Sequence, residues 1–242
     1  MQFDRERKAS DLEILIDYLE IVAVAAGEKP AHLQGQGMRS ITFMQAVRRV
    51  ATAHGLLVMQ TGPLLPRLLR APTYDPRFFE GERQRDREER VREGPVLWVY
   101  RDRDLEPAIR SATEGETDVS AVLGYPACCV REYFEAGVRM SEATVRAYQT
   151  QYGAKDADDF IRLAKENAAV TIPHADRPQI RHVFSYVQFA PCRECAESPA
   201  SPGAEINWAM KRLASRLSPA FVRAIDKAIK VEVPFRRQQK RR

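Results

Sequence analysis

The chain has 242 residues, of which 44% are hydrophobic and 29% charged, and it is long enough for one large or two small globular domains. Its formal net charge of +5 comes from the end of the chain, where residues 236–242 hold five basic residues and no acidic one. The remaining 33 basic residues balance the 33 acidic ones, which excludes a generally basic surface as the source of the charge. Contact with nucleic acid is therefore predicted only through this tail.

Nothing in the sequence favours a membrane protein. The longest apolar stretch near the N-terminus, residues 21–26, is far shorter than the roughly 20 residues that span a bilayer. The first eight residues carry charges of both signs and do not resemble a secretory leader. We therefore expect a cytoplasmic protein without membrane partners, in a reducing compartment where disulfides are uncommon.

Caps and apolar spacing predict two helices in the N-terminal part. Ser10 and Glu13 form a capping box ahead of apolar residues at helical spacing, so a helix is expected up to Gly27. A second helix is expected over 40–54. The other segments are predicted to be irregular or exposed: the glycine-containing connector 32–37, the proline-interrupted segment 62–76 and the charged segment 80–93.

One strand is clearly signalled, at 96–100, where β-branched and aromatic residues follow a proline. Further helices are predicted over 104–112, 118–124, from 126 onward, and over 141–152, 156–167, 204–217 and 219–230. The expected fold is mainly α with a minor β element, built around a four-cysteine centre. The expected organisation is an N-terminal helical region (1–93), a cysteine-bearing helical domain (94–235) and the basic tail (236–242).

The four cysteines form two pairs, and the second pair has a spacing known from metal and redox sites. Cys192 and Cys195 lie in a Pro-Cys-x-x-Cys sequence. At this spacing two thiolates can turn onto one metal or cluster, or form a redox disulfide. One such pair alone is only moderately specific.

The first pair, Cys128 and Cys129, follows Gly-Tyr-Pro126, and this proline is a natural start of a helix. The positive end of the helix dipole is expected to lower the pKa of both thiols. Neighbouring helical side chains point about 100° apart, so the two sulfurs are expected to converge poorly on one zinc ion. An iron–sulfur cluster, in which each sulfur meets a different iron, is therefore preferred.

Other interpretations of the cysteines and their neighbours remain open. The four could be ordinary core residues, or a thiol–disulfide system with a Cys192–Cys195 disulfide. His182, ten residues before Cys192, is a further candidate ligand or proton donor, although a hydrogen-bonded structural histidine is the simpler interpretation. Tyr125 is expected to pack beside the doublet and could donate a hydrogen bond to a sulfur.

The segment Leu123-Gly-Tyr-Pro-Ala-Cys-Cys-Val-Arg-Glu-Tyr-Phe134, together with the later Pro-Cys-x-x-Cys, resembles a little-characterised family of prokaryotic proteins. Those proteins carry a Leu-Gly-Tyr-Pro-x-Cys-Cys-Val box and a downstream cysteine pair. The match covers about residues 104–198. It implies that the four cysteines belong together, and it implies no particular reaction.

The sequence therefore predicts a cytosolic metal-binding protein, with Cys128, Cys129, Cys192 and Cys195 as the ligands of an iron–sulfur cluster. Redox or sulfur-related chemistry would then involve a small molecule or a redox partner. The alternative is a zinc-stabilised binding module whose tail, 236–242, contacts nucleic acid or another acidic partner. The sequence does not decide whether the protein is an enzyme.

Overall fold

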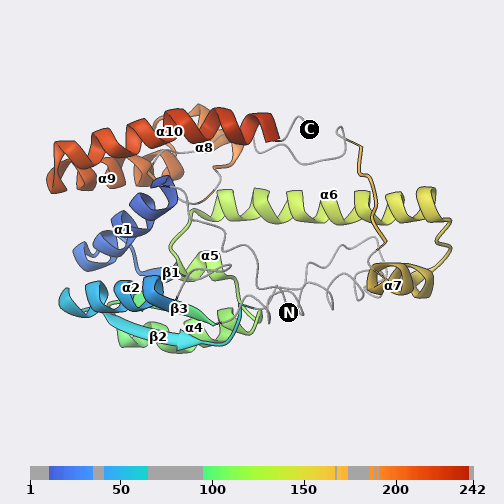
Figure 1. Ribbon diagram of the computed structural model, residues 1–242, viewed down its shortest axis with the longest axis horizontal. Helices are drawn as coiled ribbons and strands as arrows, with labels where there is room; N and C mark the ends of the chain where they lie inside the picture. Colours follow the sequence, from blue (N-terminus) through green and yellow to red (C-terminus); the bar gives the residue numbers. More distant parts are fainter. Residues whose placement is uncertain are drawn as a thin grey trace.

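The computed structural model describes residues 11–34, 41–64, 95–166, 168–173, 186–187, 189 and 191–239. Its helices are α1 (Asp11–Ala26), α2 (Ile41–Ala53), α4 (Glu106–Thr113), α5 (Val119–Val122), α6 (Ala127–Tyr152), α7 (Ala157–Lys165), α8 (Arg193–Glu197), α9 (Pro202–Leu217) and α10 (Pro219–Gln239), with a 3-10 turn η2 (Arg103–Leu105). The strands are β1 (Ala31–Gln34), β2 (Leu57–Thr61) and β3 (Val96–Tyr100) (Figure 1). The prediction of a mainly α fold with a minor β element is confirmed.

The three strands form one small antiparallel sheet with β3 in the middle. Trp98 of β3 lies opposite Leu33 on β1 and Met59 on β2. The sheet therefore joins strands from the predicted region 1–93 to a strand from the predicted region 94–235.

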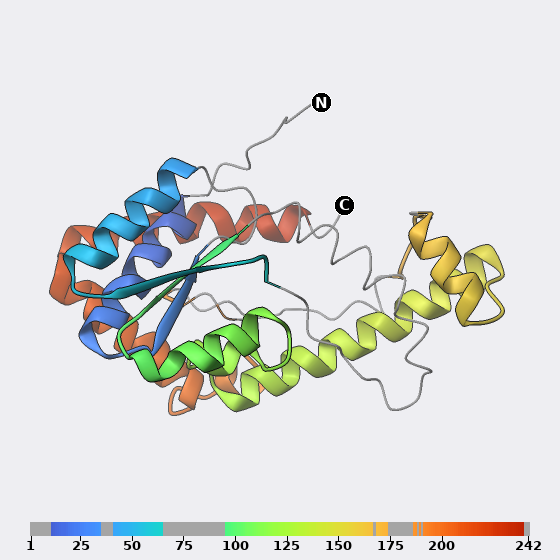
Figure 2. The same cartoon turned by 90° about the horizontal axis from the view of Figure 1, so that it is seen from below.

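Strand β3 is apolar throughout because both of its faces are covered. Leu97 and Val99 pack into a cluster with residues of α1 and α2. Trp98 and the residues alternating with it pack against α4 and α5 on the opposite face. All five β3 residues are buried, which explains an unbroken apolar run in place of the alternation of a half-exposed strand. Figure 2 shows the sheet between these helices.

A second core lies where α1 meets α9 and α10, which run side by side at one end of the molecule (Figure 1). Ile16 and Leu19 of α1 pack there with Met210, Leu213 and Ile225. Three of the cysteines are buried in the same core. From this core α6 extends to the opposite end, where it packs with α7 around Tyr148 and Phe160.

Two strands were not predicted. Segment 32–37 was expected to be a connector, but residues 31–34 form β1. The apolar pattern fails there because two inward positions are polar: His32 and Gln34 are 0% and 2% exposed. Strand β2, at the sheet edge, is only partly buried and lacks a clear alternation of apolar and polar residues.

Two helices are longer than predicted. The separate helices expected from 126 and over 141–152 are one helix, α6, because Ser141 does not cap a new helix. Its hydroxyl instead donates a hydrogen bond of 3.1 Å to the carbonyl oxygen of Gly137, one turn earlier. Helix α10 continues past residue 230 to Gln239.

Some predictions concern residues outside the described part of the chain. These are residues 65–76 of the proline-interrupted segment, the charged segment 80–93, His182 and the last three residues of the basic tail. Within the described part, no helix combines the length and the apolar character needed to cross a membrane.

Candidate metal centre

The first cysteine pair opens α6. The chain turns at Gly124, whose φ is +72°, and passes through Pro126 into the helix. Cys128 and Cys129 are therefore the second and third residues of α6, in the opening turn that the sequence predicts.

The second pair is held by a short helix that the sequence did not predict. Cys192 is the N-cap of α8, and its Sγ accepts a hydrogen bond from the backbone N–H of Cys195 at 3.4 Å. A cap of this kind requires the capping side chain to fold back over the first turn. The capping geometry therefore brings the sulfur of Cys192 toward the backbone of Cys195.

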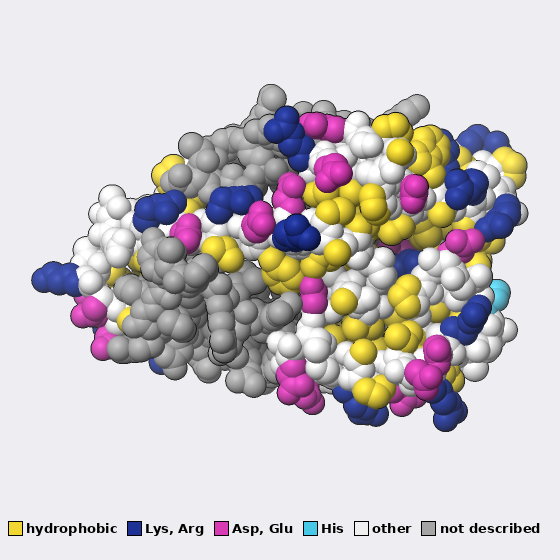
Figure 3. Space-filling view, turned by 180° about the vertical axis from the view of Figure 1, so that it is seen from behind, with side chains coloured by type: hydrophobic (Ala, Val, Ile, Leu, Met, Phe, Trp, Pro, Cys, Tyr) yellow, Lys and Arg dark blue, Asp and Glu magenta, His cyan; other side chains and the backbone are white. Residues whose placement is uncertain are grey.

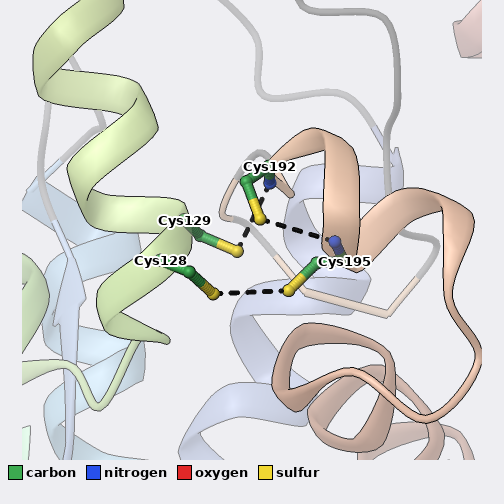
Figure 4. Close-up of side chains that lie close together, drawn as sticks. All are labelled: Cys128, Cys129, Cys192 and Cys195. Atoms are coloured by element: carbon green, nitrogen blue, oxygen red, sulfur yellow. Dashed lines mark hydrogen bonds between the residues drawn. The ribbon is translucent and has the colours of Figure 1, made fainter.

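The four sulfurs form one cluster between α6 and α8 (Figure 4). All four Sγ atoms lie within 4.8 Å of one another, and the Sγ atoms of Cys128 and Cys195 are 3.5 Å apart. The structure thus brings together the residues that the sequence grouped across more than sixty positions. The group could hold a metal ion.

The sulfurs differ in how they are held. Cys129, Cys192 and Cys195 are buried, whereas Cys128 is partly exposed. Each buried sulfur accepts one backbone N–H: Cys129 from Cys192 at 3.3 Å, Cys192 from Cys195 at 3.4 Å, and Cys195 from Gly203 at 3.3 Å. No backbone N–H of the described residues donates to Cys128, whose sulfur has the other sulfurs as its polar neighbours.

The expected lowering of both doublet pKa values is wrong. Burial, followed by the neighbouring thiols, raises the pKa of Cys128 to about 11. Burial also raises the pKa of Cys129, because it outweighs the backbone hydrogen bond from Cys192. At Cys195 burial acts in the same direction, but the N–H of Gly203 and its other hydrogen-bond partners lower the pKa overall. Desolvation and the close approach of the other thiols therefore raise both pKa values of the doublet.

The Gly-Tyr-Pro turn ahead of α6 is enclosed by two other parts of the chain. A Cβ at Gly124 would lie 2.8 Å from Cδ of Pro30, at the turn that leads into β1. The ring of Tyr125 packs on Phe189 at a centroid distance of 4.9 Å, three residues before Cys192. Tyr125 also packs against the core cluster that contains Cys129, in agreement with the predicted place beside the doublet, but the described residues show no hydrogen bond from Tyr125 to a sulfur.

Behind this turn lies a cluster of buried charges that the sequence pattern does not reveal. Glu20 of α1 forms an ion pair with Lys29 at 3.1 Å and a hydrogen bond with His32 Nδ1 at 2.9 Å. The other ring nitrogen of His32 lies 3.2 Å from Oε1 of Gln34, and Asp17 is also buried nearby. Lys29 Nζ lies 5.2 Å from the centroid of Tyr125.

The missed signal was the pair Asp17 and Glu20, spaced by three residues in a helix that is otherwise mostly apolar. Burial would raise the pKa of Glu20, but Lys29 and His32 outweigh it and lower this pKa to about 2. For Tyr125, burial and then the carboxylates of Glu20 and Asp17 raise the pKa well above its usual value. The charge cluster is thus electrostatically coupled to the turn that positions the doublet.

A surface pocket of about 670 Å³ lies along α9, lined by Glu28, Pro202, Glu205, Ile206, Trp208, Ala209, Met210 and Arg212. In the view from behind, exposed hydrophobic side chains gather over the end of the molecule formed by α1, α9 and α10 (Figure 3). The lining mixes charged and apolar side chains, whereas small-molecule sites are mostly apolar with a few polar groups. We assign this pocket no ligand.

No family model matches this sequence, and no curated protein or solved structure is significantly similar to it. The resemblance of the Leu123–Phe134 segment to a prokaryotic family stays a prediction, as does the role of the four cysteines as ligands.

Proposed function

We propose that this is a metal-binding protein whose four cysteines coordinate one tetrahedral metal ion, with zinc as the best fit. The observation that carries the proposal is the spacing of the sulfurs. Four thiolates around one zinc at Zn–S distances of about 2.3 Å stand about 3.8 Å apart. The 3.5 Å between Cys128 and Cys195, and the limit of 4.8 Å for the whole group, lie close to this value.

The same spacing is less suited to the iron–sulfur cluster favoured by the sequence. In a four-iron cluster each thiolate binds a different iron, so the irons themselves hold the sulfurs farther apart than one ion does. Adjacent helical residues diverge, which from the sequence alone disfavours zinc. Here α8 presents its two sulfurs to the opening turn of α6, and the sulfurs of Cys128 and Cys129 both lie within the 4.8 Å group.

The surroundings support a closed, structural centre. A catalytic zinc keeps one position for water or substrate, whereas a structural zinc is filled by four protein ligands. Four thiolates around a divalent ion carry a net charge of −2, and the three backbone N–H groups that point at sulfurs offset part of that charge. Bound metal would then fix α6 to α8 at the edge of the core shared by α1, α9 and α10.

Protein purified without oxygen tests the proposal by metal analysis and absorption spectroscopy. We expect one zinc per chain, little iron, no acid-labile sulfide and no colour. Iron with labile sulfide would support the cluster, and iron without sulfide would support a single iron bound by four thiolates. The matched variant Cys129→Ser gives the background metal content. Wild-type protein that holds no more metal than this variant would contradict the proposal.

A further inference from the structure

The four cysteines differ in their exposure to solvent, and therefore in how easily an oxidant can reach each of them. Cys129, Cys192 and Cys195 are 3%, 4% and 1% exposed, and each accepts a backbone N–H. Cys128 alone is partly exposed. Among the described residues no backbone group donates to its sulfur, so its hydrogen-bond contact there is with the sulfur of Cys195.

Cys128 also has a partner within reach. Its Sγ lies 3.5 Å from that of Cys195, which belongs to the other half of the cluster (Figure 4). The Cys-x-x-Cys pair would be the usual choice for a disulfide. In this structure the sulfur of Cys192 is already held as the cap of α8, because it accepts the N–H of Cys195, whereas the sulfur of Cys128 lies nearest to that of Cys195.

We propose that Cys128 is an oxidation site, and that peroxide acting there links Cys128 to Cys195 and releases the metal. This inference rests on the proposed metal centre. It predicts a different disulfide from the Cys192–Cys195 bond that the spacing of the cysteines alone suggests.

The chemistry balances with a peroxide as the oxidant. While it binds the metal, Cys128 is a thiolate despite the raised pKa of its free thiol. This thiolate attacks one oxygen of hydrogen peroxide, which breaks the O–O bond, forms the sulfenic acid and releases hydroxide. The Cys195 thiolate then attacks the sulfur of the sulfenic acid, forms the disulfide and expels a second hydroxide. Peroxide gains two electrons and the two sulfurs lose them together. Only two thiolates remain for the metal, which is then weakly held and leaves.

The test uses purified full-length protein whose metal content has first been measured. Substoichiometric hydrogen peroxide is added, released metal is followed with a chromophoric chelator, and free thiols are alkylated before peptide mapping by mass spectrometry. We expect a Cys128–Cys195 linked peptide that grows in step with metal release. A Cys192–Cys195 or Cys128–Cys129 peptide as the first product, or release without any disulfide, would overturn the inference.

Two matched variants each remove one cysteine. In Cys129→Ser the pair Cys128 and Cys195 remains, so the linked peptide should still form; in Cys128→Ser peroxide-driven disulfide formation at Cys195 should be lost. Equal behaviour of the two variants would contradict a special role for Cys128. The initial metal measurement keeps the two proposals separate. Metal-loaded protein that forms a different disulfide refutes the oxidation site alone. Metal-free protein refutes the metal centre, and the mapped disulfide still shows which cysteines react.

Discussion

Replacing Glu20 by Gln is the most informative perturbation of the buried charge cluster, because the Glu20 carboxylate pairs with both Lys29 and His32. Glu20 is 1% exposed, 3.1 Å from Lys29 Nζ and 2.9 Å from His32 Nδ1. Glutamine keeps the shape but removes the charge, so the Lys29 ammonium stays buried without its ion pair. Removal of one partner of a buried pair typically costs about 3–5 kcal/mol.

The pKa of Glu20 gives a second measure of the free energy that this carboxylate contributes to folding. Burial raises this pKa, but Lys29 and His32 outweigh burial and lower it from 4.5 to about 2. At 1.36 kcal/mol per pKa unit, the carboxylate stabilises the fold by about 3 kcal/mol. Since the folded pKa is the lower one, this contribution is complete above pH 4.5 and is lost as the pH falls from there toward 2.

Urea unfolding followed by tryptophan fluorescence measures the loss, since Trp98 is fully buried in the sheet. We expect Glu20→Gln to lower the free energy of unfolding at neutral pH by about 3 kcal/mol, and by progressively less below pH 4.5. The control is Glu28→Gln, whose ion pair with Arg216 lies at the surface and should contribute under about 1 kcal/mol.

The double variant Glu20→Gln/Lys29→Met removes both charges of the ion pair and should recover much of the loss. If Glu20→Gln lowers the free energy of unfolding no more than Glu28→Gln does, the buried ion pair does not stabilise the fold as predicted. An effect of Glu20→Gln that does not diminish in acid would also contradict this prediction.

Three further predictions concern the turn, the sheet and the centre. Gly124→Ala should lower the free energy of unfolding by about 1–3 kcal/mol and weaken metal binding, because the φ of Gly124 is positive and Pro30 occupies the place of a Cβ. Gly153→Ala, also at positive φ but with open space around it, should lower it by only about 1 kcal/mol in the same unfolding assay. Thr113→Val removes the acceptor of the buried Trp98 indole N–H and should lower the free energy of unfolding by about 1–3 kcal/mol. Thr150→Val, at the surface, should change it by less than about 0.5 kcal/mol. Zinc affinity, measured by chelator competition, should fall as the pH is lowered, because protons compete with zinc for the thiols and the pKa of Cys128 is raised to about 11. A pH-independent affinity would contradict thiolate ligation.

The fold class, the central strand and the grouping of the cysteines could be predicted because each leaves a local mark in the sequence. Strand β3 is an unbroken apolar run, and the N-caps Asp118 and Asp156 stand where their helices begin. The charge cluster could not be predicted in this way. Glu20 and His32 occupy inward positions that apolar periodicity assigns to hydrophobic residues, and their partners become visible only when α1 and β1 are packed together.

The Leu-Gly-Tyr-Pro box acquires a physical explanation from the same packing. Leu123 is buried against the sheet, Gly124 lies where Pro30 leaves no room for a side chain, and Tyr125 lies between Phe189 and Lys29. These contacts come from the sheet, from the turn at Lys29 and Pro30, and from Phe189, and together they fix the direction in which α6 starts. Two adjacent cysteines in a first helical turn can meet a distant pair only if that turn is fixed in this way. A substitution in the box should therefore weaken metal binding more than it weakens the sheet, although no residue of the box outside the doublet would contact the metal.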